Sequence, residues 1–327
     1  MSRRTTPFVA TVVALPLVMV GCGAGPAVVG MHDAPAENSD GASITEETAT
    51  DVTARVLEDA AATRKEGAKA SEQERKAVFA GPALRASDAA VESKDEQTHA
   101  GGASKDLQVL SISKGTEWPR AVLATSQDEV TQFLHVLVAQ AADQPYRLFA
   151  DVPMAAGASV PALAPVSEGS SVTVADEPGT DVTTAVKAWS EGVGHPPPKK
   201  EPEGVSFDDA FSTALQKNAK ARDKDLGDLA RYRQKQSTAD VASVSFELVR
   251  GGRLSFVPMT RTDTITASDK LKVLRIEDPA IRRVLDASTV QKKLSVKHAE
   301  TLAMVTPAKG DATVVGVNDV VQSATGE

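Results

Sequence analysis

The chain has 327 residues, enough for two ordinary domains, and 41% of them are hydrophobic, which excludes wholesale disorder. Its 44 acidic residues outnumber the 36 lysines and arginines, and the resulting net charge of -8 argues against a nucleic-acid-binding surface. The single cysteine excludes both a disulfide scaffold and a zinc site built from several thiolates.

The N-terminal segment has the order of a signal peptide. A short basic start precedes an apolar run over residues 8–20, which is shorter than the roughly 18 to 20 residues that a membrane span needs. Met19, Val20 and Gly21 come directly before Cys22, and this sequence resembles the lipobox of bacterial lipoproteins. The resemblance implies cleavage before Cys22, attachment of lipid such as palmitate to it, and a membrane-anchored protein at the extracytoplasmic face.

Two other interpretations of this segment stay open. It could be an uncleaved membrane anchor, since no charged residue occurs between Thr5 and Met31. Against that, Pro16, Pro26 and several glycines would break a helix repeatedly. It could also be cleaved to leave a soluble protein, with no lipid on the cysteine. The route of export is not decided by the sequence.

Changes in composition divide the rest of the chain. A stretch rich in glycine, alanine, proline and serine follows the signal segment and is typical of a flexible tether. A similar, weakly charged stretch separates two halves that each contain helical and strand patterns. The predicted organisation is a signal peptide (1–21), a tether (22–42), a first α+β domain (43–153), a connecting segment (154–181) and a second α+β domain (182–327).

The first half begins with helical patterns. Ser43 and Glu46 have the spacing of a capping box ahead of an amphipathic helix over 48–65. A second such pair, Ser71 and Glu74, precedes a helical run to residue 91 that Gly81-Pro82 interrupts. The apolar period then changes to two, which predicts four strands at 107–112, 120–124, 132–140 and 146–152.

The second half repeats this order. Helices are predicted over 182–191, over 206–235 with Ser206 and Asp209 as a capping pair, and over 279–286. Strands are predicted at 241–250, 253–259, 261–266, 271–276, 293–305 and 313–321, with Gly251-Gly252 as a hairpin turn. The predicted class is therefore α+β, with two consecutive units of helices followed by a curved antiparallel sheet.

Several stretches of the chain carry a resemblance to a known family. They are Val78–Leu84, Trp118-Pro119-Arg120, Gln144–Leu148, the Met154–Leu163 passage and Val305–Gly310. With them the chain resembles a family of actinobacterial envelope lipoproteins whose function is not established. The resemblance implies tandem cystatin-like or NTF2-like units, in which a curved antiparallel sheet wraps a helix. It implies no catalytic residue.

The residues that usually carry chemistry are scattered. The five histidines are isolated in sequence, so we predict no metal site, and His135 and His298 are interpreted as satisfied strand residues. The chain has no Gly-x-Ser-x-Gly elbow and no phosphate-binding loop. Asp208 and Asp209 are explained by their place at a helix start. We therefore predict no catalytic residue and no cofactor.

The sequence supports two functions of different class. The first is a non-catalytic binding or scaffold protein of the envelope, held to the membrane by lipid, whose partner is an unidentified envelope protein or cell-wall ligand. The alternative is an envelope enzyme that uses a pocket in one NTF2-like unit. Trp118 is interpreted as a core residue at the start of a strand, with an exposed binding anchor as the alternative.

Overall fold

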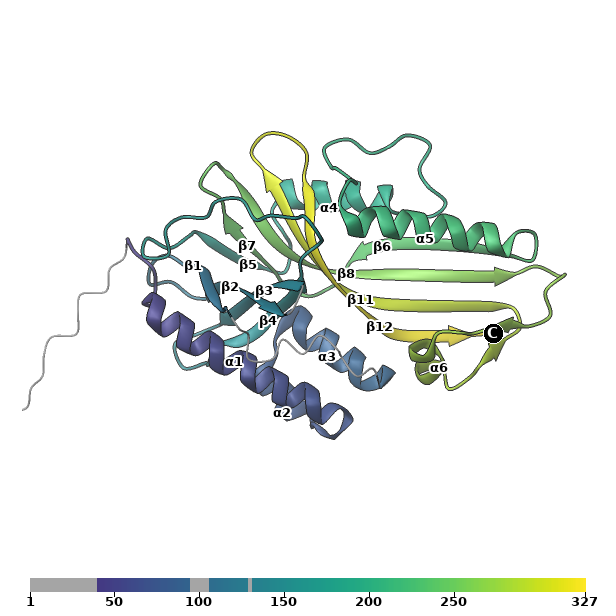
Figure 1. The fold of residues 1–327 in the computed structure, drawn as a ribbon, viewed down its shortest axis with the longest axis horizontal. Helices are drawn as coiled ribbons and strands as arrows, with labels where there is room; N and C mark the ends of the chain where they lie inside the picture. The colour runs from purple at the N-terminus through teal and green to yellow at the C-terminus, as the bar shows by residue number, and fades with distance from the viewer. Residues whose placement is uncertain (1–39, 95–105, 129–130) are drawn as a thin grey trace, which may run out of the picture. The chain divides into compact units, whose positions relative to one another are not determined.

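The computed structural model describes residues 40–94, 106–128 and 131–327 (Figure 1). The predicted signal peptide, the lipobox with Cys22 and most of the predicted tether lie outside these residues. By its contacts, Asn38–Glu327 forms one compact unit. The assignment of 43–153 and 182–327 to separate domains stays a prediction. Among the described residues, no helix is both long enough and apolar enough to cross a membrane.

The first part of this unit consists of three helices followed by an antiparallel sheet, as predicted. The helices are α1 (Glu46–Glu66), α2 (Glu72–Val78) and α3 (Gly81–Ser93). The sheet has the strand order β1-β2-β3-β4, formed by Gln108–Ile112, Arg120–Asp128, Thr131–Ala139 and Arg147–Pro153.

One predicted cap is confirmed and two were wrong. Ser71 and Glu74 form the predicted capping box, with each side chain accepting a hydrogen bond from the other's backbone N–H. The cap of α1 is Thr45, whose Oγ1 accepts from the backbone of Thr48. The predicted pair at Ser43 was wrong because the backbone N–H of Ser43 is bonded to the carbonyl of Ser113, at the end of β1. The predicted pair Ser206 and Asp209 does not form, because α5 (Ala210–Leu226) begins later and Asp209 itself is the cap, accepting from the backbone N–H of Ser212.

The first sheet is buried on both faces. On one face Leu137 packs with the apolar stripe of α1, including Leu57. On the other face Leu134, Val136 and Val138 pack against aromatic residues of a second sheet. The alternation predicted along β3 is confirmed, and one face contacts helices while the other contacts a sheet.

The second sheet has six strands in the order β12-β11-β8-β7-β5, and β6 pairs with the far part of β8. Its strands are β5 (Val172–Ala175), β6 (Ala230–Thr238), β7 (Ser243–Glu247), β8 (Gly252–Ala267), β11 (Lys293–Pro307) and β12 (Thr313–Gly326). β5 comes from the predicted connecting segment, which is therefore not a simple connection, because its alternating Val172 and Val174 extend the sheet beside β7.

Three helices and a small two-stranded sheet complete this part. Helices α4 (Thr180–Gly192) and α5 (Ala210–Leu226) cover one face of the second sheet, with the buried Trp189 of α4 at the centre of their contact. The short helix α6 (Pro279–Leu285) lies between the two-residue strands β9 (Leu274–Arg275) and β10 (Thr289–Val290).

The long helix predicted over 206–235 is shorter than expected. It starts after its cap Asp209 and ends at Gly227, which has a φ of 50°. The residues from Ala230 to Lys235 alternate between buried and exposed and form the first part of β6.

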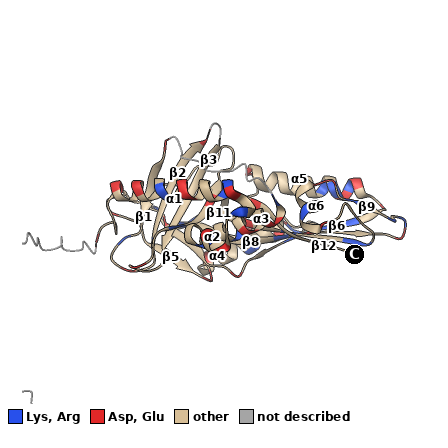
Figure 2. Ribbon diagram, turned by 90° about the horizontal axis from the view of Figure 1, so that it is seen from below, with Lys and Arg blue, Asp and Glu red and all other residues tan. Residues whose placement is uncertain are grey.

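The two strands predicted at 253–259 and 261–266 are one continuous strand, β8. Acidic and basic residues are interleaved along α1 and α5 (Figure 2), as expected of solvated helix faces.

The last strand contacts the first sheet directly. Asn318 of β12 donates a hydrogen bond from Nδ2 to the carbonyl of Asp151 in β4, at 2.8 Å. Gly316 bridges to Met154, and a Cβ at Gly316 would lie 2.6 Å from the carbonyl oxygen of Pro153. The two sheets therefore approach so closely here that only glycine fits.

Candidate functional site

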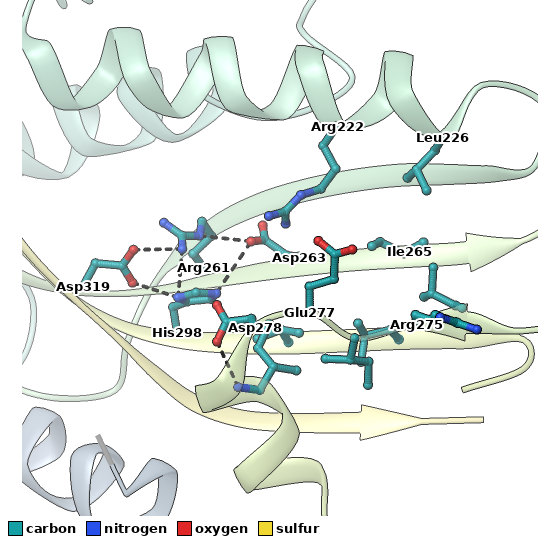
Figure 3. Close-up of a pocket in the computed structure, with 15 residues that line it drawn as sticks. Arg222, Leu226, Arg261, Asp263, Ile265, Arg275, Glu277, Asp278, His298 and Asp319 are labelled. Carbon is teal, nitrogen blue, oxygen red and sulfur yellow. Dashed lines mark hydrogen bonds and ion pairs between the residues drawn. The ribbon is translucent and has the colours of Figure 1, made fainter. Parts of the chain in front are cut away.

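A cavity of about 490 Å³ lies on the face of the second sheet that α5 covers (Figure 3). Its walls come from α5, from strands β8, β9, β11 and β12, and from α6 with the segment that leads into it. The lining residues are Arg222, Leu226, Arg261, Asp263, Ile265, Leu274, Arg275, Ile276, Glu277, Asp278, Ile281, Leu294, Val296, His298 and Asp319. One part of the cavity is therefore aliphatic and the other is charged.

The charged part is a band across two long strands. On the inward face of β8, the apolar Val257 and Met259 are followed by Arg261 and Asp263, and then by Ile265. On the same face of β11, Val296 and Leu302 flank His298 and Glu300 in the same way. Pairing places His298 directly opposite Arg261. The sheet thus carries buried charges between two apolar clusters.

Arg261 is at the centre of this band. Its Nη1 lies 2.7 Å from Glu300 Oε1 and its Nη2 lies 2.8 Å from Asp319 Oδ2. Its Nε lies 3.4 Å from Asp263 Oδ2, a longer ion pair without an aligned hydrogen bond. These carboxylates hold the pKa of Arg261 above its usual range despite the opposing effect of burial. The guanidinium therefore neutralises acids of which two, Asp263 and Glu300, are buried.

His298 connects the same groups. Its Nδ1 lies 2.8 Å from both Arg261 Nη2 and Asp319 Oδ1. A guanidinium only donates hydrogen bonds and a carboxylate only accepts them. Nδ1 therefore accepts from Arg261 when it carries no proton and donates to Asp319 when it carries one. Its Nε2 lies 3.6 Å from Asp263 Oδ2.

The pKa values of the acids of the band are shifted in opposite directions. Burial and the nearby Asp319 raise the pKa of Glu300 to about 8, against the lowering effect of Arg261. Burial alone would also raise the pKa of Asp319, but contacts with His298 and Arg261 lower it. Burial and the nearby Asp263 raise the pKa of Tyr232, whose hydroxyl donates to Gln234 Oε1.

Asp263 and Arg222 line the cavity beside the band. The carboxylate of Asp263 is buried beside the hydroxyl of Tyr232, which is hydrogen-bonded to it. The side chain of Arg222 extends from α5 toward Asp263 and Glu277 (Figure 3), and its guanidinium stacks over the ring of Tyr232. Four carboxylates and three guanidinium groups line the cavity, so its charge is slightly negative when His298 is neutral.

A second titratable cluster lies in the first sheet. Ser126 Oγ is 2.7 Å from His135 Nε2, and His135 Nδ1 is 3.0 Å from Asp151 Oδ1, an arrangement with the order of a Ser-His-Asp triad. Asp151 also pairs with Arg64 of α1 at 2.7 Å. All three side chains are buried, and the contact between His135 and Asp151 is not an aligned hydrogen bond. None of the three lines a cavity described above. We interpret this cluster as a buried ion pair that orients a structural histidine.

The sequence located few of these residues. His135 is buried and partnered, as predicted, and His298 lies in a strand with partners but lines the cavity. Trp118 is 36% exposed, with the Arg120 guanidinium 4.4 Å from its ring centroid, so its interpretation as a core residue was wrong. Cys22 lies outside the described residues. Sequence reasoning missed the charged residues at inward positions of β8 and β11, which would have indicated the charged part of the cavity.

Comparison of the chain with protein-family models, curated proteins and solved structures finds no match. Within the described ranges, no group of three or more His, Cys, Asp or Glu side chains is placed to hold a metal ion. In the charged band, the guanidinium of Arg261 lies among the carboxylates in the place where a cation would be held.

Proposed function

We propose that this chain is a lipid-anchored binding protein at the extracytoplasmic face of the cell membrane, and that its ligand is a small organic cation with an aliphatic body. The anchor is supported by the lipobox-like residues ending at Cys22. The ligand class is supported by one observation: a cavity whose aliphatic part adjoins a charged part in which four carboxylates outnumber three guanidinium groups. An excess of carboxylates beside apolar side chains favours a ligand that carries a positive charge on an aliphatic body.

The charges of the cavity favour a cationic ligand over an anionic one. Arg261 is already surrounded by carboxylates and has no free face for an anion. Removing a carboxylate ligand from water into a slightly negative cavity would be opposed by Asp263 and Asp319. An ammonium group beside Asp263 would instead neutralise the excess charge. The aliphatic chain of the ligand would lie along Ile265, Leu294 and Val296.

The ligand class can be tested with hexylamine, hexanol and hexanoate as probes. At ten times its Kd a ligand stabilises a protein by about 1.4 kcal/mol, which for a unit of this size raises Tm by roughly 2 to 4 °C. We expect this rise with hexylamine, less with hexanol and none with hexanoate. Asp263→Asn should abolish the preference for the amine, whereas Asp269→Asn, an exposed acid outside the cavity, should keep it. Equal shifts for amine and carboxylate would overturn the ligand class.

The lipid anchor has a separate test in cells. Cys22→Ala removes the thiol to which lipid would be attached, so the protein should move from the membrane fraction to the soluble fraction. Cys22→Ser serves as a second variant because it keeps the size of the side chain and likewise has no thiol. If both variants stay in the membrane fraction while the wild type incorporates no labelled palmitate, the proposed anchor is wrong.

An enzyme remains a second candidate, favoured by the contact of His298 with both Asp319 and Asp263 inside a cavity. A histidine between two carboxylates can exchange protons with a bound molecule. The position of Arg261 favours binding, because it neutralises the acids that would act with the histidine. The fate of the ligand separates the two: a binding protein releases it with unchanged covalent structure, as NMR of the recovered ligand would show, and an enzyme does not.

A further inference from the structure

We infer that the turns joining β7 to β8 and β11 to β12 form a docking surface for the headgroup layer of an anionic membrane. The surface, called the hairpin-tip surface below, consists of Pro161, Ala162, Leu248, Val249, Arg250, Gly251, Pro307, Ala308 and Lys309. The inference rests on the proposed lipid anchor, which would hold this surface near a membrane. It adds that the protein has a defined orientation there.

The hairpin-tip surface combines apolar and basic side chains. All of its residues except Val249 line a hollow of about 690 Å³. Val249 is 61% exposed, more than Trp118, Leu229 or Val273, the other large apolar side chains exposed in the described part of the chain. Arg250 and Lys309 are the charged residues lining the hollow, and none of the residues lining it is acidic. Asp311 lies in the second turn outside this lining.

The two turns are held rigidly beside each other. Gly252 has a φ of 86°, and a Cβ there would lie 2.3 Å from the carbonyl oxygen of Thr306. The first turn is closed by a hydrogen bond from the backbone N–H of Gly251 to Leu248. The N–H of Val249 donates to the carbonyl of Ala162 at 3.0 Å. Val249 is therefore presented on fixed backbone, so contact with a membrane requires no ordering of the turn.

The hairpin-tip surface is close to the point where the chain enters the compact unit. The N–H of Ala42, near the start of the compact unit, is bonded to the carbonyl of Ser167. Ala162 precedes Ser167 by five residues and accepts the hydrogen bond from Val249. Five residues span at most about 18 Å. The 17 residues between Cys22 and Asp40 allow a reach of at most roughly 65 Å. An anchor at Cys22 would thus hold the hairpin-tip surface within reach of the headgroups.

The chemistry of the surface matches the headgroup layer. Arg and Lys side chains beside a bilayer are attracted to anionic phosphate groups, and an exposed aliphatic side chain can enter the interface between them. The net charge of -8 for the whole chain opposes binding from solution. Docking therefore depends on a tether, which raises the local concentration of the surface at the membrane.

The test uses the chain from residue 22 with Cys22→Ala and an N-terminal histidine tag, bound to vesicles that contain a nickel-chelating lipid. The compact unit begins at Asn38, so this chain keeps every described contact. Val249→Cys then supplies the only thiol, which is labelled with an environment-sensitive dye. On vesicles rich in phosphatidylglycerol we expect the dye emission to rise about twofold and shift to shorter wavelength. Vesicles of phosphatidylcholine alone should give a smaller change.

The matched control is Val273→Cys, labelled in the same way. Val273 is 47% exposed and follows the other end of β8, about 50 Å from the hairpin-tip surface along the strand. Its dye should not respond. Replacing Arg250 and Lys309 by glutamine should remove most of the response at position 249. Equal responses at the two positions, or a response at position 249 that survives both replacements, would overturn the inference.

These outcomes do not depend on lipid at Cys22, because nickel holds the chain on the vesicle. A failure of the dye experiment therefore leaves the proposed anchor intact. Conversely, retention of both Cys22 variants in the membrane fraction, with no labelled palmitate on the wild type, would overturn the anchor and leave the docking result standing.

Discussion

Replacing Arg261 by methionine should lower the free energy of unfolding by about 3 to 5 kcal/mol at neutral pH. The guanidinium contacts Glu300 at 2.7 Å and Asp319 at 2.8 Å, and its side chain is only 7% exposed. Methionine fills a similar volume without charge, so the buried Asp263 and Glu300 would lose their cation, and Asp319 would lose an ion pair. Urea denaturation followed by circular dichroism measures the effect.

The loss at Arg261 should depend on pH. In the variant, the carboxylates that have lost their cation take up protons more readily, so the difference from the wild type should shrink as the pH falls toward about 4. Arg233→Met is the matched control, because Arg233 is exposed on β6, and it should change stability by no more than about 0.5 kcal/mol. If the two variants lose equal stability, the charged band does not stabilise the fold in this way.

The second large effect is expected for Asp151→Asn in the first sheet, which should lose about 3 to 5 kcal/mol. The carboxylate pairs with the buried guanidinium of Arg64 at 2.7 Å and faces His135 at 3.0 Å. Asparagine keeps the shape but removes the charge, which leaves a buried cation without its carboxylate. Thermal and urea unfolding at neutral pH, with intact secondary structure before the transition, would show the loss.

The pH dependence of this loss has a definite sign. Burial alone would raise the pKa of Asp151, but Arg64 and His135 outweigh it and hold the pKa well below its usual range. The stability that Asp151 contributes is therefore fully present above about pH 4 and is lost as the pH falls toward its lowered pKa. Wild type and variant should converge in acid. Asp143→Asn, at an exposed loop residue of the same sheet, should show no such convergence.

Secondary structure followed from the sequence where apolar residues alternate cleanly. All four strands of the first sheet were predicted, because β3 in particular places apolar side chains on both faces. β6 was missed because its outward positions are Arg231, Arg233 and Lys235, and its inward positions include Gln234. That pattern of polar residues resembles the end of a solvated helix. β5 was missed because it is four residues long, within a stretch rich in alanine and proline.

The candidate site could not be predicted because it depends on strand register. Arg261, His298 and Asp319 come from three strands, and only the pairing of β11 with β8 and β12 places them together. Taken one at a time, each residue has an ordinary explanation as part of a polar strand face. Predicting β8 as two separate strands also concealed that Arg261 and Asp263 continue the inward face of Val257 and Met259.

The contact of β12 with β4 has a consequence for how the chain reaches its folded state. The bonded residues Asn318 and Asp151 are 167 positions apart, so the first sheet is synthesised long before the strand that covers its edge exists. Contacts between such distant residues are associated with slow folding. A chain that leaves the ribosome or a translocation channel from its N-terminus would hold the β4 edge of the first sheet uncovered until β12 emerged. During that interval the half-made protein would be open to chaperones, proteases and self-association.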